Sequence, residues 1–219
     1  MLLLAVDTSG KQGSIALARC LLPDVCEILE VVDLVGGTFS AQLVPQIAGL
    51  LSELGLGKTD IDGFTVVSGP GSFTGLRVGL AAMKALGEIL AKPIAPISLL
   101  EVVAVAGQIK TKSLAAIDAG RGEVYVGEYD GRGLGRQQLL SMTEFLTSAQ
   151  GIPVITADAN IANAVRHAGS SVQEIARPRA DDVARLGWRK IQAGELASPD
   201  ELDANYIRRS DAEIFSPPR

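Results

Sequence analysis

The feature that most constrains the fold is a set of three short apolar runs that occurs twice along the chain. The first set, with turn residues between its members, predicts three consecutive strands over Leu2–Thr8, Ser14–Ala18 and Glu27–Asp33. The second set repeats this order over Ser113–Asp118, Glu123–Asp130 and Arg136–Leu140. The segment Ala5-Val6-Asp7 corresponds to Ala116-Ile117-Asp118, 111 residues later. This internal similarity predicts two duplicated lobes.

Helical patterns alternate with these strands. Apolar residues at three- and four-residue spacings predict an amphipathic helix over Ser40–Leu54, and a stretch that is apolar nearly all round predicts a buried helix over Leu76–Leu90. The remaining expected elements are helices over Ser98–Ile109, Ala159–Ala168 and Asp181–Ala193, strands over Gly63–Val67, Pro93–Ile97 and Pro153–Thr156, and a capping box at Ser141–Glu144. We therefore expect an α/β protein with mixed sheets flanked by helices. Its expected lobes are residues 1–109 and 110–219, with the last helix free to pack back on the first lobe.

Charge and apolar patterning exclude several classes of protein. Twenty basic residues against twenty-five acidic ones give a net charge of −5, the wrong sign for a protein that grips a nucleic-acid backbone unaided. The N-terminal apolar run ends at Asp7, and the run Leu76–Leu90 is interrupted by Lys84 and Glu88. Neither run has the length and flanks of a transmembrane span or a secretion signal. We expect a cytoplasmic protein with no membrane partner.

The cysteine and histidine counts limit the chemistry. Only two cysteines occur, Cys20 and Cys26, and they flank a predicted turn. Two free thiols are expected in a cytoplasmic protein, and a disulfide across the turn is the alternative. The single histidine, His167, excludes any mechanism that needs two histidines of this chain on one metal ion. We expect no metal site.

A glycine-rich segment between a strand and a buried helix is the most informative motif. It consists of Gly69, Pro70, Gly71, Ser72, Phe73, Thr74 and Gly75. Such a helix start exposes free N–H groups that can hold a phosphate or carboxylate, and Arg77, in the first turn of the expected helix, suggests a nearby anion. The alternative is that Arg77 pairs with an internal carboxylate and that the glycines let two helices pack closely. The segment lacks the glycine-lysine-serine ending of a phosphate-binding loop.

Two further turns follow the first strand of each lobe. Asp7, Thr8 and Ser9 lie in one turn and Asp118 lies in the other, where actin-like ATPases hold phosphate and a metal-bound aspartate. The first turn is short of glycine and the second has no hydroxyl residue, so the two form a poor nucleotide site. A small actin-like, ATP-dependent phosphotransferase that uses both aspartates is the rival hypothesis.

The glycine-rich segment, the buried helix and Ser98-Leu99-Leu100-Glu101 closely resemble the bacterial tRNA threonylcarbamoyladenosine biosynthesis proteins of the TsaB (YeaZ-type) family. Other matching segments are Leu4-Ala5-Val6-Asp7-Thr8-Ser9, Leu43-Val44-Pro45, Ala116-Ile117-Asp118-Ala119, Glu123-Val124-Tyr125, Asn205-Tyr206-Ile207-Arg208-Arg209 and Asp211-Ala212-Glu213. The resemblance implies an actin-like (ASKHA, ribonuclease H-like) fold of two lobes. It also implies a role in placing threonylcarbamoyl on the adenosine beside the anticodon of tRNAs that read codons beginning with A.

In that family the transfer belongs to a larger homologue, TsaD, which carries a pair of histidines that binds its metal. Because His167 is alone, the resemblance implies a non-catalytic subunit with no catalytic residues. The implied partners are TsaD, the ATPase TsaE, tRNA indirectly through the complex, and a second copy of the chain when alone. No intrinsic cofactor is implied, and ATP or ADP at the complex interface stays open.

The partner surface of the family is a helical face of the first lobe. The resemblance maps it to the two helices Ser40–Leu54 and Leu76–Leu90. The interface candidates are Leu43, Val44, Ile47, Leu51, Gly75, Gly79, Ala82 and Leu86. An exposed apolar stripe there would bind the partner or a second copy. The alternative is that these positions cover the sheet of their own lobe.

Overall fold

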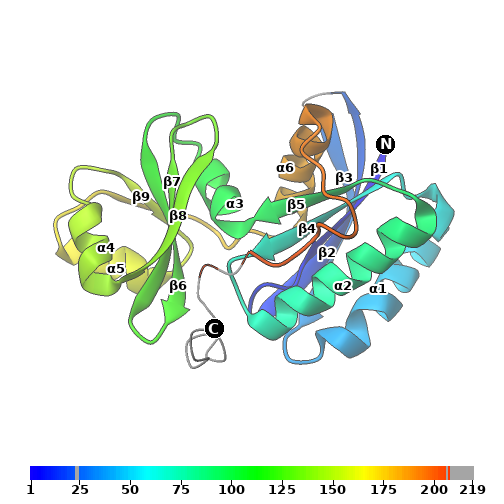
Figure 1. The fold of residues 1–219 in the computed structure, drawn as a ribbon, viewed down its shortest axis with the longest axis horizontal. Helices are drawn as coiled ribbons and strands as arrows, with labels where there is room; N and C mark the ends of the chain where they lie inside the picture. The colour runs from blue at the N-terminus through cyan, green and yellow to red at the C-terminus, as the bar shows by residue number, and fades with distance from the viewer. Residues whose placement is uncertain (23–24, 206, 208–219) are drawn as a thin grey trace, which may run out of the picture. The chain divides into compact units, whose positions relative to one another are not determined.

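The computed structural model describes residues 1–22, 25–205 and 207, which fold into two compact units (Figure 1). Unit 1 contains residues 1–102 and 178–204, and unit 2 contains residues 103–177 and Asn205. The elements of unit 1 are β1 (Leu2–Asp7), β2 (Gln12–Leu22), β3 (Val25–Val35), α1 (Phe39–Glu53), the 3-10 helix η1 (Lys58–Asp60), β4 (Gly63–Gly69), α2 (Phe73–Leu90), β5 (Ile94–Ser98) and α6 (Ala180–Ala193). Helix α3 (Leu99–Ala106) spans the boundary, and unit 2 continues with β6 (Ser113–Gly120), β7 (Glu123–Tyr129), β8 (Leu134–Ser141), α4 (Met142–Ser148), β9 (Val154–Thr156), α5 (Ala159–His167) and β10 (Val172–Glu174).

The two sheets have the same topology. Sheet 1 has the order β3-β2-β1-β4-β5, and sheet 2 has the order β8-β7-β6-β9-β10. In each, the first three strands of the unit form an antiparallel meander, and the last two lie parallel to the first. The predicted duplicated α/β fold with mixed sheets flanked by helices is confirmed.

Unit 1 has helices on both faces of its sheet. A Cβ at Gly79 of α2 would contact Val6 and Val66, whereas a Cβ at Gly187 of α6 would overlap Thr65. Because neighbouring residues of a strand point to opposite faces, α2 and α6 cover opposite faces of sheet 1. Helix α1 packs beside α2 (Figure 1).

The division of the chain differs from the expected lobes 1–109 and 110–219. The first crossing between units falls between Val102 and Val103, inside α3. Helix α6 belongs to unit 1, where the backbone N–H of Ala180 donates to Ser14 Oγ over 2.9 Å. The amphipathic pattern of α6 predicts a buried face but does not say which sheet it covers.

Unit 2 is organised around its own core. Side chains of β6, β7, β9, α4 and α5 form one buried cluster: Leu114, Ala116, Val124, Val126, Phe145, Ala149, Val154, Ile161 and Val165. The predicted capping box opens α4, since Glu144 N donates to Ser141 Oγ and Ser141 N donates back to Glu144 Oε2. This prediction is confirmed.

Three local predictions need correction. Helix α2 begins at Phe73 rather than Leu76, because Ser72 caps it through the N–H of Gly75. Helix α3 ends at Ala106 instead of Ile109, and strand β10 was not expected.

The expectation of two free thiols is wrong. The hairpin register places Cys20 of β2 opposite Cys26 of β3, with their Cα atoms 4.1 Å apart, and the two form a disulfide. Spacing in the sequence shows only that the two flank a turn, whereas the register decides that they face each other. Within residues 1–22, 25–205 and 207, we find no helix with the length and hydrophobicity needed to traverse a bilayer.

Candidate functional site

The glycine-rich segment joins the end of β4 to the start of α2. The N–H of Gly75 donates to Ser72 Oγ over 3.4 Å, and the N–H of Leu76 donates to the Ser72 carbonyl oxygen. The N–H of Ser72 itself donates to the carbonyl oxygen of Ser9 over 2.6 Å. The start of the helix is therefore bonded to the turn that follows β1.

Glycine is required at this contact for steric reasons. A Cβ at Gly71 would overlap the main chain of Ser9, and a Cβ at Gly75 would overlap the carbonyl oxygen of Thr8. One turn further along α2, a Cβ at Gly79 would overlap Thr8 Oγ1. The glycines allow the turn after β1 to lie directly on α2, so the close contact joins a turn to a helix rather than the two helices that the packing alternative expected.

The polar groups of this turn bond to one another and to α2. Asp7, Thr8 and Ser9 are 2%, 1% and 2% exposed. The N–H and the hydroxyl of Ser9 both donate to Asp7 Oδ1, over 2.8 and 2.6 Å, and Thr8 Oγ1 donates to the carbonyl oxygen of Gly75. These three candidates for anion binding form a buried, internally bonded network.

Arg77 does not lie where the sequence placed it. Because α2 begins at Phe73, Arg77 sits beyond the first turn, so its position no longer indicates an anion. It is exposed, and its guanidinium lies 3.8 Å from the centroid of the Phe73 ring.

Asp118 occupies the position in unit 2 that corresponds to Asp7. It accepts a hydrogen bond from the N–H of Gly120 over 2.8 Å, as Asp7 does from the N–H of Ser9. Unlike Asp7, it is exposed, and its own N–H donates to Asp158 Oδ2. The structure brings Asp7, Thr8 and Ser9 together with the glycine-rich segment in unit 1, and Asp118 lies in unit 2.

Most of the interface candidates cover their own sheet. Leu43, Ile47, Leu51, Gly75 and Gly79 are buried inside unit 1, and Ala82 and Leu86 are half-buried. Only Val44 among the eight is well exposed, at 62%. The expected apolar stripe is therefore mainly the inner face of these helices.

The outer side of α1 has a feature that the apolar stripe did not reveal. Every exposed position before Glu53, the last residue of α1, is uncharged: Ser40, Ala41, Val44, Pro45, Gln46, Ala48, Gly49 and Ser52. The adjacent helix α2 exposes charged residues beside its apolar ones, including Arg77 and Glu88, so the uncharged surface is a property of α1. Surface helices ordinarily place charged residues on the outer face, so we name these exposed residues of α1 the outer face and treat it as the candidate interface.

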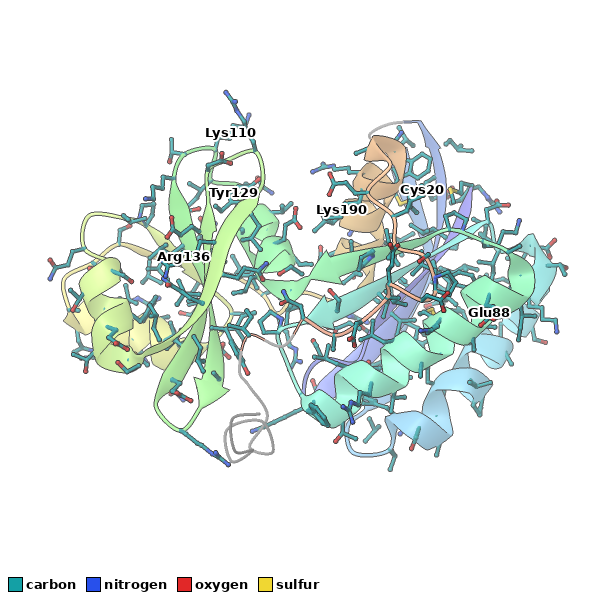
Figure 2. The ribbon with its side chains drawn as sticks, in the orientation of Figure 1. Cys20, Glu88, Lys110, Tyr129, Arg136 and Lys190 are labelled. Carbon is teal, nitrogen blue, oxygen red and sulfur yellow. A yellow bond between two sulfur atoms is a disulfide. The ribbon has the colours of Figure 1, made fainter. Side chains whose placement is uncertain are left out.

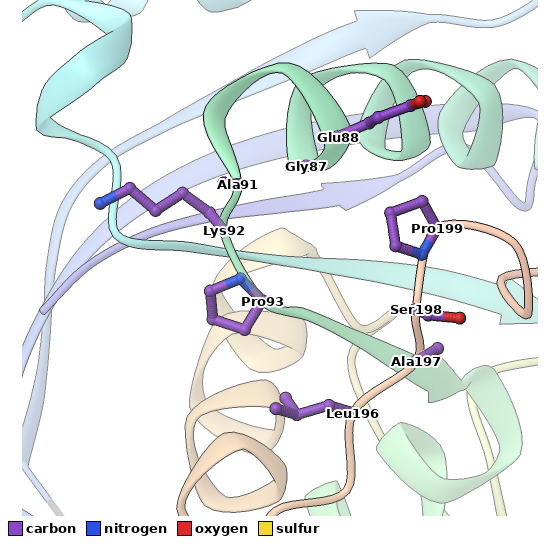
Figure 3. Close-up of a pocket in the computed structure, with 9 residues that line it drawn as sticks. All are labelled: Gly87, Glu88, Ala91, Lys92, Pro93, Leu196, Ala197, Ser198 and Pro199. Carbon is purple, nitrogen blue, oxygen red and sulfur yellow. The ribbon is translucent and has the colours of Figure 1, made fainter.

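A hollow of about 480 Å³ lies at the carboxyl end of α2 (Figure 3). It is bounded by Gly87, Glu88 and Ala91 of this end, by Lys92 and Pro93, and by the segment Leu196–Pro199. The Lys92 side chain extends away from Ser198 and Pro199, and its Nζ lies 3.5 Å from Asp62 Oδ1. Without convergent polar groups, this hollow does not have the form of a catalytic pocket.

Lys190 and His167 have structural roles. Lys190 of α6, labelled in Figure 2, lies 3.1 Å from Glu101 Oε2 and 2.7 Å from Glu195 Oε2. Burial opposes its charge, but the two carboxylates together raise the pKa of Lys190 above its ordinary value. His167 is exposed at the end of α5, with Nδ1 2.7 Å from the Asn163 carbonyl oxygen. In the described part of the chain, no three His, Cys, Asp or Glu side chains gather closely enough to hold a metal ion.

Comparison with known proteins identifies the family. A family model described as "TsaD: tRNA N6-adenosine threonylcarbamoyltransferase" matches residues 34–160, which is more than half of the chain. The chain belongs to the TsaD family. The match runs from the end of β3 through α1, the glycine-rich segment and α2 into unit 2.

Curated relatives support the resemblance stated from the residues. The chain is 35% identical over 130 residues to the "tRNA threonylcarbamoyladenosine biosynthesis protein TsaB" of Bacillus subtilis (strain 168), covering 59% of this chain and 55% of that protein. It is 33% identical over 132 residues to the protein of the same name from Escherichia coli (strain K12), with the same coverage. The chain thus spans little more than half the length of the curated relatives it matches.

Solved structures confirm the predicted actin-like fold. A Pseudomonas aeruginosa protein described as having similarity to peptidase YEAZ superposes with a TM-score of 0.75 at 25% identity, covering 94% of this chain and 99% of that one. "YeaZ from Pseudomonas aeruginosa" superposes with a TM-score of 0.74 at 24% identity, covering 94% and 100%. The predicted resemblance to the TsaB (YeaZ-type) proteins is confirmed.

Proposed function

We propose that this chain is a non-catalytic subunit that binds and activates a TsaD-type catalytic homologue. The reaction is the transfer of threonylcarbamoyl to the adenosine beside the anticodon of tRNAs that read codons beginning with A. Its membership of the TsaD family and its similarity to proteins named for threonylcarbamoyladenosine biosynthesis support a role in this modification.

The observation that carries the binding role is the uncharged outer face of α1. A helix whose outer side faces solvent ordinarily carries charged residues on that side. The exposed residues of α1 before Glu53 are all uncharged. Small residues such as Ala41, Ala48 and Gly49 let another helix approach closely, and Val44 supplies apolar area. The occupant that fits is a similarly apolar helical face of the catalytic homologue, or of a second copy when that homologue is absent.

Two features support the absence of catalysis in this chain. It has one histidine, so it cannot supply the histidine pair that the family's catalytic members use to bind metal. Asp7, the residue that would hold a nucleotide-bound metal in a phosphotransferase, is buried and bonded to Ser9. We therefore assign ATP or ADP, where bound, to the interface of the complex.

The net charge of −5 supports indirect contact with tRNA. The catalytic homologue would supply the basic surface, and an ATPase of the TsaE type would join the assembled pair.

The first test is in vitro threonylcarbamoylation of tRNA with the catalytic homologue, the ATPase and the separate threonylcarbamoyl-adenylate synthase. We expect modification only when this chain is added, and none when the catalytic homologue alone is left out. Equal modification with and without the chain would reject the activating role. Nucleotide turnover by the chain alone that disappears in Asp7→Ala would favour the phosphotransferase instead.

The second test concerns the outer face. Val44→Glu places a charge at the centre of the exposed part of α1, and Leu196→Glu is the matched control, an exposed apolar residue outside both helices. We expect Val44→Glu to weaken binding of the catalytic homologue at least about tenfold, the effect of about 1.4 kcal/mol, and Leu196→Glu to leave it unchanged. Equal affinities of both variants would reject this face as the interface, and sedimentation of the chain alone tests pairing of two copies in the same way.

A further inference from the structure

The two cysteines of the chain lie where one thiol can be reached and the other cannot. Cys20 is 1% exposed, and its N–H and carbonyl oxygen are bonded to Met1, each over 2.8 Å. Cys26 is half-buried on β3, the edge strand of sheet 1. Cys26 is therefore the more accessible of the two residues, whereas the sheet interior shields Cys20.

The register of the hairpin keeps the two residues as partners whether or not their sulfurs are joined. Cys20 pairs with Cys26, and Arg19 pairs with Glu27 in the next position of the β2–β3 ladder. Backbone pairing with β1 also holds β2 on its other side up to this end of the strand. Backbone pairing thus places the two cysteines opposite each other, without help from the bond between their sulfurs.

We propose that Cys26 is a site of reversible S-thiolation by low-molecular-weight disulfides, with Cys20 as the resolving thiol. In the first step the Cys26 thiolate attacks one sulfur of a small disulfide. A bond forms between Cys26 Sγ and that sulfur, the bond within the small disulfide breaks, and one thiolate leaves and takes up the proton released by Cys26.

In the second step the Cys20 thiolate attacks Cys26 Sγ. The Cys20–Cys26 bond forms, the mixed disulfide breaks, and the second small thiol leaves with the proton of Cys20. Two protein thiols are oxidised and one small disulfide is reduced to two thiols. Excess small thiol reverses both steps, and it attacks first at Cys26 because that sulfur is the accessible one.

The disulfide joins the ends of β2 and β3 on one face of sheet 1. Ser14 of β2 faces α6, because its hydroxyl accepts from the N–H of Ala180. Cys20 lies six residues along the same strand, so the two-residue period places it on the face that α6 covers. Oxidation therefore ties the edge strand to β2 on that face, and we expect slower amide exchange around Cys20 and Cys26 in the oxidised chain, with unit 2 unchanged.

The test treats single-cysteine variants of the full chain with oxidised glutathione and follows intact mass. Cys20→Ser should accumulate one glutathionyl group on Cys26, and Cys26→Ser should gain none. Wild-type protein should pass through the mixed disulfide to an internal disulfide, which reduced glutathione reopens. Cys20→Ala serves where the serine variant fails to fold, and the variant lacking both cysteines controls for other sites.

Faster thiolation of Cys26→Ser than of Cys20→Ser would overturn the assignment of roles. A mixed disulfide that persists in wild-type protein would overturn the resolving role of Cys20, and a disulfide that reduced glutathione never opens would overturn reversibility. The measurement uses the chain alone, so its outcome is independent of whether the chain activates a catalytic homologue.

Discussion

Substitution of Gly75 by alanine tests the packing of the β1 turn on α2. The new Cβ would lie well inside the 3.0 Å below which real Cβ contacts essentially never occur, against the carbonyl oxygen of Thr8. Overpacking costs about 1–3 kcal/mol, and the upper end applies because a main-chain atom cannot rotate away. Alanine is the better helix former by about 1 kcal/mol, so we expect Gly75→Ala to lower the free energy of unfolding by about 2 kcal/mol.

Gly49 is the matched control, because it lies within α1 and a Cβ there has no neighbour within 4 Å. Gly49→Ala should therefore stabilise the chain by about 1 kcal/mol. Urea unfolding can be followed through Trp188, the single tryptophan, which belongs to α6 and hence reports on unit 1. Shifts of the same sign and size in Gly49→Ala and Gly75→Ala would refute the steric reasoning.

Gly79 provides a second control, because its obstacle is a side-chain atom. A Cβ there would overlap Thr8 Oγ1, so Thr8→Ala should remove most of the cost of Gly79→Ala. The same Thr8→Ala change should not rescue Gly75→Ala, whose obstacle is the main chain. Rescue of both variants would show that the turn moves as a whole.

Three further predictions concern charge and core packing. Lys190→Met should lower the free energy of unfolding by about 2 kcal/mol, because it leaves the carboxylate of Glu101, whose side chain is 13% exposed, without its ammonium partner. A smaller loss for Lys190→Met than for Glu101→Gln in chemical unfolding would contradict this. The N–H of Leu2, and after it the ammonium of Lys92, hold the pKa of Asp62 below its ordinary value of 3.8. The contribution of Asp62 to the free energy of unfolding is therefore present above pH 3.8 and is lost as the pH falls through the folded pKa. Melting temperatures between pH 7 and pH 2 should therefore fall less in Asp62→Asn than in wild-type protein. Phe145→Ala should destabilise unit 2 by about 3–5 kcal/mol and leave amide exchange in unit 1 unchanged.

Local periodicity of apolar residues made several strands and helices predictable from the sequence. Strand β1 is buried along its whole length and is apolar up to Asp7, and α1 places Leu43, Ile47, Leu50 and Leu51 at helical spacings on its buried side. The repeat of the β1 and β6 segments also predicted the duplication, which the shared topology of the two sheets confirms. Strand β10 escaped prediction because three residues, Val172–Glu174, give no measurable alternation.

Long-range pairing could not be predicted in the same way. The amphipathic pattern of α6 identifies its buried residues, but only the structure shows that they cover sheet 1 and that Ala180 bonds to Ser14. The start of α2 was misplaced because the glycines of the preceding segment suggested a loop. In the structure, Phe73, Thr74 and Gly75 already lie in the helix that Ser72 caps.

The candidate interface shows a more general limit of pattern analysis. An apolar stripe at helical spacing marks whichever face of a helix is buried, so Leu43, Ile47 and Leu51 could not distinguish an interface from a core. The informative positions are those on the opposite side, where a helix in water should carry charge and α1 does not. Once the structure fixes the inner face, the absence of charge on the outer face becomes an observation of its own. That observation leads to Val44 rather than to Leu43 as the residue whose substitution should break the complex while leaving the fold intact.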